Sequence, residues 1–243
     1  MPEGPSILIL KEAVQQFKGR KILEASGNLK TINLSELTGR KIIDFKSWGK
    51  HFLILLPKLT LRVHFLMFGS YTIDERKDRP ERLRLVFTNG SLNFYSCAIR
   101  PLQADPDEIY DWSADVMNEQ FDKKAALKKL RADPEALVCD ALLDQDIFAG
   151  VGNIIKNEVL YRIRLHPESR VGNLPARRLR QLVDEAVNYS FDFLQWKKAY
   201  VLRAHWLAHN KKICPRDGQP FTRKHLGRTN RRSFYCEQCQ KKY

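Results

Sequence analysis

Leu83-Arg-Leu-Val-Phe-Thr-Asn-Gly-Ser-Leu-Asn-Phe-Tyr95 contains two strand-like runs on either side of the pair Asn89-Gly90. Asn-Gly between such runs is typical of a tight antiparallel hairpin with a primed turn, whose twist matches that of its strands. The segment therefore predicts a two-stranded hairpin, Leu83–Phe87 with Leu92–Tyr95.

Short strand-like runs also precede this hairpin. Many short strands separated by turns favour two packed sheets. We predict such strands at Lys41–Phe45, His51–Leu56, Leu59–Phe65 and Arg82–Phe87. Before them, Pro5 suits the first turn of a helix, and apolar residues at near-helical spacing continue it to a stop at Gly19.

Beyond the hairpin, Pro101 and Asp105-Pro106 lie in an acidic segment that resembles a linker. Helical spacing follows, with Pro134 and Pro175 at expected first-turn positions. The predicted helices are Lys123–Arg131, Pro134–Phe148, Ile154–Arg162 and Pro175–Trp196.

The positive charge of the chain is concentrated at one end. The chain carries a net charge of +14, and from Lys197 to Tyr243 there are 13 Lys and Arg against 2 acidic residues, so +11 lies in the last 47 residues. A basic module of this kind favours a nucleic-acid partner over a simply solvated basic face. A membrane partner is not expected, because no apolar run approaches the roughly 18 residues of a membrane span and no lipidation signal accompanies the charge.

Three of the five cysteines lie close together in this basic end. Cys236-Glu-Gln-Cys239 has the spacing of a zinc knuckle, and Cys214-Pro-Arg-Asp217 supplies a third thiol and a carboxylate. We predict a structural Zn²⁺ ion on these four residues, with His225 as a competing fourth ligand and a metal-free hairpin as the other reading. Cys97 and Cys139 are predicted to be small buried side chains.

Candidate phosphate ligands surround this pattern. Gly227 suits a turn, from whose tip Arg228, Arg231 and Arg232 would project as guanidinium forks. Upstream, Ala149-Gly-Val-Gly-Asn-Ile-Ile155 places Asn153 as the expected N-cap of a helix whose first backbone N–H groups favour phosphate.

Two segments near predicted strand ends add candidates in the first half. Lys50 could pair with a phosphate, and His64 could donate to one. Leu66-Met-Phe68 could form an apolar tip that enters a base stack. Taken alone, Met67 and Phe68 are more often core residues than such a wedge.

The chain opens Met1-Pro2-Glu3-Gly4-Pro5. Removal of Met1 would leave Pro2 with a free secondary amine, and an amine that attacks a sugar C1′ atom gives an iminium ion. Glu3 beside it could act as an acid. The alternative reading is a polar start before a helix.

Together these motifs resemble the formamidopyrimidine-DNA glycosylase / endonuclease VIII family over essentially the whole chain. The matching segments are residues 2–5, 49–50, 64–69, 142–153 and 231–240. Leu-Leu-Asp-Gln at 142–145 and Tyr95-Ser96 look closer to the endonuclease VIII branch.

The resemblance implies an α+β fold: an N-terminal two-layered β-sandwich with flanking helices, then a helical domain with a helix–two-turn–helix motif and a zinc-ribbon-like β-hairpin. The implied divisions are a catalytic domain at 1–104, a linker at 105–118, the helix–two-turn–helix domain at 119–205 and the zinc hairpin at 206–243.

It also implies a bifunctional DNA glycosylase and AP lyase of base-excision repair, acting on double-stranded DNA with an oxidised base or an abasic site. Oxidised pyrimidines are the expected substrates, removed through a proline iminium and followed by β- and δ-elimination. The implied catalytic residues are Pro2, Glu3 and Lys50, and the implied DNA-binding residues are His64, Met67, Phe68, Asn153 and Arg231.

The sequence differs from the family pattern at four places: Ser6 replaces a glutamate, Asp217 replaces a cysteine, Leu66 and Phe68 replace a more polar wedge, and the hairpin before Arg231 is longer. Arg232 or Arg228 could therefore serve in place of Arg231. Oxidised purines, or binding of damaged DNA without turnover, are the alternative functions. A cytoplasmic, nucleoid-associated monomer of bacterial type is expected.

Overall fold

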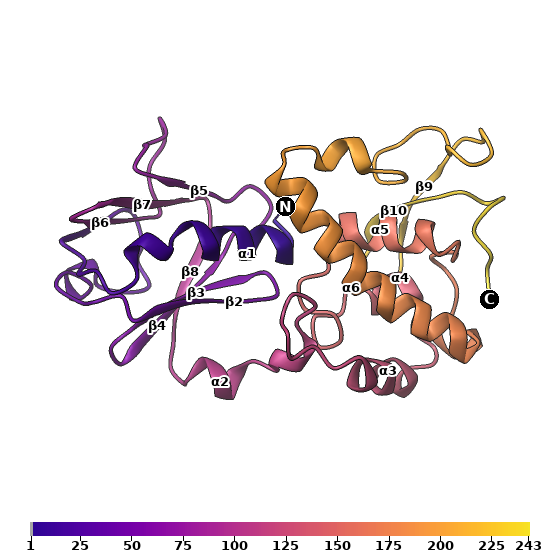
Figure 1. The fold of residues 1–243 in the computed structure, drawn as a ribbon, viewed down its shortest axis with the longest axis horizontal. Coiled ribbons are helices and arrows are strands. Elements are labelled where there is room, and N and C mark those ends of the chain that lie inside the picture. Colours follow the sequence, from indigo (N-terminus) through magenta and orange to yellow (C-terminus); the bar gives the residue numbers. More distant parts are fainter. Residues whose placement is uncertain (1) are drawn as a thin grey trace. The chain divides into compact units, whose positions relative to one another are not determined.

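The computed structural model describes residues 2–243, so the predicted removal of Met1 lies outside the described residues. The chain divides into two compact units, one ending at Asp111 and the other beginning at Trp112. Figure 1 shows most of the strands in the first unit, and the longest helix and a C-terminal hairpin in the second.

The first unit contains two four-stranded antiparallel sheets and the helix α1 (Gly4–Ala13). One sheet has the order β1-β6-β7-β5, with strands Glu24–Ser26, Leu83–Phe87, Gly90–Tyr95 and Ser70–Ile73. The other has the order β2-β3-β4-β8, with strands Asp44–Trp48, His51–Leu56, Leu59–His64 and Ala98–Leu102.

The two sheets share one hydrophobic core. In β6 burial alternates with period two, as expected for a strand with one buried face. Phe52 of β3 and Phe94 of β7 meet with ring centroids 6.1 Å apart, and α1 buries Ile7 and Leu10 in the same core. The predicted two-layered sandwich is confirmed.

The hairpin β6–β7 is present, but its predicted turn type is wrong. Phe87 pairs with Gly90, so Thr88 and Asn89 occupy the two turn positions, and neither has a positive φ. A type I′ turn requires positive φ at both positions. Gly90, at φ +138°, begins β7 instead, and the Asn89 amide donates to the Gln16 carbonyl oxygen at 2.9 Å.

The predicted strand Lys41–Phe45 is shifted by three residues to β2. Trp48 pairs with His51 across the tight turn at Gly49-Lys50. This turn fixes the register of β2 against β3, so β2 continues to Trp48. Strands β1, β5 and β8 were not predicted. They are short, and β8 contains Pro101, which is unusual within a strand.

The second unit is built around α3 (Lys123–Ala132), α4 (Val138–Ala141), α5 (Asn153–Arg162) and the 23-residue α6 (Ala176–Lys198). Their apolar faces form a second core that includes Leu130, Phe148, Val159 and Leu182. The predictions of α3, α5 and α6 are confirmed to within two residues at each end.

The predicted helix Pro134–Phe148 is wrong, because only α4 forms within it. Leu137 is extended and pairs with Arg170. Beyond α4, the Asp144 carboxylate accepts the Asp146 N–H at 2.9 Å, and Gln145 bonds the backbone of Leu143 and Gly150. These local side-chain bonds replace helical backbone bonds.

The segment predicted as a linker, residues 105–118, contains the short helix α2 (Pro106–Ile109) and a 3₁₀ turn, Trp112–Ala114. The boundary between the two units falls inside it. Among residues 2–243, no helix combines the length and apolar character that a membrane span requires.

The second unit ends in a hairpin of β9 (Thr222–Leu226) and β10 (Arg231–Tyr235). Asp140, buried on α4, holds its tip: its carboxylate accepts the N–H groups of Arg228 at 2.8 Å and Thr229 at 3.1 Å, and the Thr229 hydroxyl at 2.8 Å. Gly227 has φ +69° and lies directly against this carboxylate, where a side chain would collide.

We predict that Asp140→Ala lowers the free energy of unfolding by about 2–3 kcal/mol, because three bonds to one buried carboxylate are lost. Asp140→Asn keeps one acceptor oxygen and should lose less. Chemical denaturation of both variants measures this, and equal stability of Asp140→Ala and the unmodified chain would contradict the role.

Candidate active site and metal centre

Pro2 and Glu3 lie at the start of α1. Glu3 is extended, with φ −114° and ψ 171°, and is the N-cap residue of the helix. Its carbonyl oxygen accepts the N–H groups of Ser6 at 2.8 Å and Ile7 at 3.3 Å. Pro5 fits this first turn because its missing N–H would have no helical partner.

The exposure of these two residues differs. Glu3 is only 1% exposed, whereas Pro2 is half-buried. The first turn of α1 therefore holds a carboxyl group at a fixed place one residue from Pro2. This is the arrangement that acid catalysis beside an N-terminal amine requires.

Lys50 is presented by the hairpin turn between β2 and β3. Gly49 has φ +52° and Lys50 does not have a positive φ, which is the pattern of a type II′ turn with glycine first. The half-buried Lys50 follows at the second position.

His64 lies directly across the sheet from His51, with ring centroids 5.4 Å apart. The Tyr110 hydroxyl lies 3.2 Å from His51 Nδ1, and the Tyr110 ring packs against Trp48 at 4.8 Å. Trp48 Nε1–H donates to the Asp111 carbonyl oxygen at 2.9 Å. His64 is therefore supported by an aromatic group that joins β2, β3 and the end of the unit.

Both imidazoles are held neutral. Burial, followed by the charges of Arg62, His64 and Lys50, lowers the pKa of His51 to about 4. Burial and then the charges of Lys50 and Arg62 lower the pKa of His64. At neutral pH, His64 can therefore donate a hydrogen bond without carrying a charge.

Acid should weaken the fold through His51. Its folded pKa of about 4 is below the unfolded value near 6.5, so the unfolded chain binds more protons between these values. Stability is thus full above pH 6.5 and is lost as the pH falls toward 4.

We expect His51→Gln to remove about 2 kcal/mol of the stability difference between pH 7 and pH 5. Denaturant titrations at both pH values test this. An unchanged pH dependence in the variant would show that His51 titrates as it does in the unfolded chain.

Leu66, Met67 and Phe68 form an exposed apolar tip. Their side chains are 47%, 58% and 80% exposed, whereas the preceding Phe65 is buried. The Gly69 N–H donates to the Phe65 carbonyl oxygen at 2.7 Å, and this close turn directs the three side chains outward. The reading of Met67 and Phe68 as core residues is wrong.

In the second unit, α5 and β10 meet through polar side chains. The Asn153 amide donates to the Arg232 carbonyl oxygen at 3.0 Å. The prediction that Asn153 is an N-cap is wrong: extended Gly152 holds that position, and Asn153 is the first residue of α5. Its side chain is directed to the hairpin instead.

The three candidate arginines of the hairpin have different surroundings. The Arg228 guanidinium pairs with Asp133 at 2.9 Å. The Arg232 side chain is exposed, and its carbonyl oxygen accepts the bonds from α5. Arg231 is half-buried at the start of β10 and forms no ion pair with any group in residues 2–243. Arg231 therefore keeps its charge available for an external anion.

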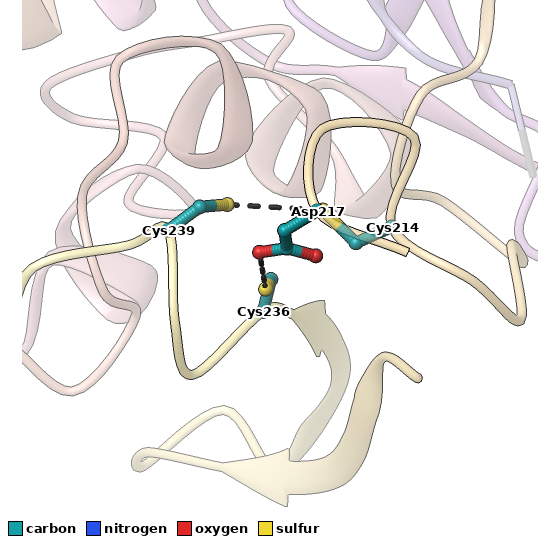
Figure 2. Close-up of side chains that lie close together, drawn as sticks. All are labelled: Cys214, Asp217, Cys236 and Cys239. Atoms are coloured by element: carbon teal, nitrogen blue, oxygen red, sulfur yellow. Dashed lines mark hydrogen bonds between the residues drawn. The ribbon is translucent and has the colours of Figure 1, made fainter. Parts of the chain in front are cut away.

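Cys214, Asp217, Cys236 and Cys239 come together at the base of this hairpin, as Figure 2 shows. One donor atom from each lies within 4.8 Å of the others. Cys214 Sγ and Cys239 Sγ are 3.8 Å apart, and Cys236 Sγ donates to Asp217 Oδ2 at 2.9 Å.

The group is consistent with a structural zinc ion. Tetrahedral zinc with bonds of about 2.3 Å to sulfur separates two thiolates by about 3.8 Å, which is the distance found here. Three thiolates and a carboxylate would carry more negative charge than Zn²⁺ neutralises. Arg216, whose Nη1 lies 3.8 Å from Cys239 Sγ, supplies a compensating positive charge.

Asp217, rather than the competing His225, belongs to this group. His225 lies on β9, exposed, with Nδ1 2.9 Å from the Asn230 carbonyl oxygen. Cys97 and Cys139 are buried in the hydrophobic cores of the first and second unit, as predicted, and burial raises their thiol pKa values to about 12 and about 11.

We predict about one zinc per chain by elemental analysis, and loss of that zinc in Cys236→Ser. Because the ion cross-links two segments of the tail, a chelator should lower the melting temperature. Cys97→Ala is the matched control and should keep its zinc. Metal-free purified protein with unchanged melting in chelator would exclude the site.

Comparison with known proteins follows the same division of the chain. The model of the formamidopyrimidine-DNA glycosylase N-terminal domain matches residues 1–99, and that of the H2TH domain of the same glycosylase matches residues 113–190. A formamidopyrimidine-DNA glycosylase of Lactobacillus helveticus is 30% identical over 218 residues, which cover 76% of this chain and 74% of the relative.

The chain belongs to the formamidopyrimidine-DNA glycosylase / endonuclease VIII family.

The family also includes longer relatives. Endonuclease 8-like 2 of Bos taurus is 36% identical over 196 residues, which are 74% of this chain and 58% of that protein. Endonuclease 8-like 3 of Xenopus laevis is 29% identical over 86% of this chain but only 36% of its own length. The chain thus spans between about one third and three fifths of these family members.

Two solved structures share the fold of this chain. A viral DNA glycosylase gives a TM-score of 0.83 at 24% identity, over 98% of this chain and 99% of that one. The Lactococcus lactis formamidopyrimidine-DNA glycosylase, in a non-covalent complex with DNA containing an AP site, gives 0.85 at 22% identity over 99% and 100%.

Several residues that support the candidate residues of each unit were not predicted. His51 and Tyr110 support His64, and Lys156, only 1% exposed, donates to Ser233 Oγ at 2.8 Å and to the Arg232 carbonyl oxygen at 3.3 Å. Glu158 is also buried. The run Lys156-Asn-Glu158 within an apolar helix was the one available signal, because charged residues are buried only with partners.

Proposed function

We propose that this chain is a DNA glycosylase and AP lyase of base-excision repair that uses Pro2 as its nucleophile. The observation that carries the proposal is the buried carboxyl group of Glu3 beside Pro2 at the start of α1, in a chain whose two parts match this family. Glu3 can act as an acid beside the Pro2 amine only if its carboxyl group is held in a fixed position next to it.

In the proposed reaction, the Pro2 nitrogen forms a bond to C1′ as the bond from C1′ to the base breaks, and the departing base takes up the proton that the amine loses. Glu3 then protonates the ring oxygen, the sugar opens, and an iminium ion joins enzyme and DNA. The iminium acidifies C2′. Loss of that proton expels the 3′ phosphate in β-elimination, and loss of the C4′ proton then expels the 5′ phosphate in δ-elimination.

DNA binding is proposed for the residues that the structure leaves available to it. Lys50 and neutral His64 at the ends of β2 and β4 would hold phosphates, with Asn153 and Arg231 doing so in the second unit. Met67 and Phe68 are exposed apolar side chains. They would fill the space that a flipped-out nucleotide leaves in the base stack. Double-stranded DNA with an oxidised or abasic site is the proposed partner.

Oxidised pyrimidines are the proposed substrates. The support is the likeness of residues 142–145 and Tyr95-Ser96 to the endonuclease VIII branch, with 36% identity to an endonuclease 8-like protein against 30% to the bacterial formamidopyrimidine-DNA glycosylase. Parallel incision assays on duplexes with an oxidised pyrimidine or 8-oxoguanine test this. Monomeric action in the cytoplasm and the four-part division at 104, 118 and 205 also remain proposals.

Borohydride reduction of the iminium should trap the chain covalently on an abasic duplex. Pro2→Leu should abolish trapping, since a bulky second residue keeps the initiator methionine and moves the amine. Glu3→Gln should retain trapping on the abasic duplex but lose excision of an oxidised base. These outcomes separate the nucleophile from the acid.

Binding to a duplex with a tetrahydrofuran abasic analogue is the control, and Pro2→Leu should preserve it. Equal trapping of Pro2→Leu and the unmodified chain would remove Pro2 from the mechanism. Undiminished excision by Glu3→Gln would remove Glu3.

A further inference from the structure

We propose that Lys77, Arg79 and Ser70 form an additional phosphate-binding site beside the apolar tip, a site that rests on the proposed function and takes a phosphate of the DNA backbone. These residues belong to the loop between β5 and β6 and to the first position of β5. This site is separate from the phosphate contacts proposed above for Lys50, His64, Asn153 and Arg231.

Two positive charges converge on one hydroxyl group. Lys77 Nζ donates to Ser70 Oγ at 2.8 Å, and Arg79 Nη2 donates to the same atom at 2.6 Å. The two nitrogens are therefore at most 5.4 Å apart. A neutral hydroxyl does not offset their mutual repulsion, whereas a phosphate with several anionic oxygens would accept from both.

Among the residues that the structure describes, none of the nearby carboxylates forms an ion pair with Lys77 or Arg79. Glu81 pairs with Arg76 at 2.6 Å, and Asp74 accepts the Ser91 N–H at 2.8 Å. Asp78, between the two cations in sequence, forms no ion pair with any group of residues 2–243. Within that range Lys77 and Arg79 likewise have no acidic partner.

Tyr95 holds both cations in place before any ligand arrives. This tyrosine is fully buried, and its hydroxyl oxygen accepts the Lys77 N–H at 3.1 Å. The Lys77 ammonium group lies 5.5 Å and the Arg79 guanidinium 5.1 Å from the ring centroid, within the range of cation–π attraction. Ordering them on a ligand therefore requires little further loss of side-chain entropy.

Serine hydroxyls complete the site. Ser70 Oγ accepts two bonds and keeps one proton to donate, which has no acceptor in the described part of the chain. Ser96 Oγ lies 3.4 Å from Arg79 Nη1. Tyr95-Ser96, a feature that resembles the endonuclease VIII branch, thus gains a physical role in this site.

The place of the site identifies the ligand. Ser70 follows the tip by two residues, so its Cα atom is no more than about 7.6 Å from that of Phe68. An apolar side chain that enters a base stack brings the neighbouring backbone phosphates to the same part of the protein. A backbone phosphate next to the base step that the apolar tip enters would match the positive charge of the site and its position beside the tip.

Salt dependence of DNA binding by the full chain tests the proposal. Lys77→Ala/Arg79→Ala should reduce the slope of log affinity against log salt by about 0.9 for the one phosphate released. We compare the affinity for a tetrahydrofuran duplex at about 50 and at about 200 mM salt. The loss of affinity over this range should be about 3-fold smaller for the double variant than for the unmodified chain. Lys21→Ala/Lys41→Ala removes the same charge where these two lysines pair before β2, at the end of the β2–β3 ladder away from the Gly49-Lys50 turn, and is the matched control.

A second experiment compares the unmodified chain and the variants on DNA with modified phosphates. Neutral methylphosphonates are placed singly along both strands. One position near the lesion should weaken binding by the unmodified chain and by Lys21→Ala/Lys41→Ala, but should leave Lys77→Ala/Arg79→Ala unaffected. Arg79→Gln, with an unchanged melting temperature, should show part of the same loss.

The outcomes separate this site from the proposed function. Equal slopes for the two double variants, or the same methylphosphonate profile for both, would overturn the site while incision by the unmodified chain continues. A chain that neither binds nor incises damaged duplexes would overturn the proposed function itself.

Discussion

The second unit depends on buried polar side chains of a single helix turn in α5. The Glu158 carboxylate accepts the N–H groups of Leu207 at 2.9 Å, Ala208 at 3.0 Å and His209 at 2.7 Å. One residue earlier, Asn157 Oδ1 accepts the Phe234 N–H at 3.0 Å, and Lys156 holds Ser233. A charged group with no exposed surface is tolerable only when it is bonded in this way. Replacing these bonds with apolar contacts would leave backbone N–H groups of two segments without partners.

This anchoring explains why the basic tail is ordered although it has few apolar residues of its own. The small core at its base contains Tyr161, Phe221 and the buried cysteines. α5 holds β10 from one side, Asp140 holds the tip, and the four-residue metal group closes the base. Arg231 stands at the start of β10, so each of these contacts also limits where its guanidinium can point. In the first unit, the Gly49-Lys50 turn does the same for Lys50, and pairing with His51 does so for His64.

The sequence predicted those parts of the fold that local rules decide. β3 was placed correctly because it is a continuous apolar run, and α6 because its amphipathic spacing extends over six turns. The segment 134–148 has similar spacing, but the pairing of Leu137 with Arg170 and the side chains of Asp144 and Gln145 override it. Such contacts join residues far apart in sequence or depend on loop geometry. Asp217 was predictable from ligand chemistry. The buried Lys156 and Glu158 were not identified, because their partners lie about 50 to 77 residues away.

The apolar tip Leu66–Phe68 lowers the stability of the fold, although its exposed side chains suit the proposed contact with DNA. Leu66 has φ +53°, a left-handed conformation that costs a leucine roughly 1–2 kcal/mol, and two further apolar side chains beside it are left in water. Natural or laboratory selection for heat resistance alone would therefore favour glycine or asparagine at 66 and hydrophilic residues at 67 and 68. This chain carries leucine, methionine and phenylalanine there, so its stability is lower than those replacements would give.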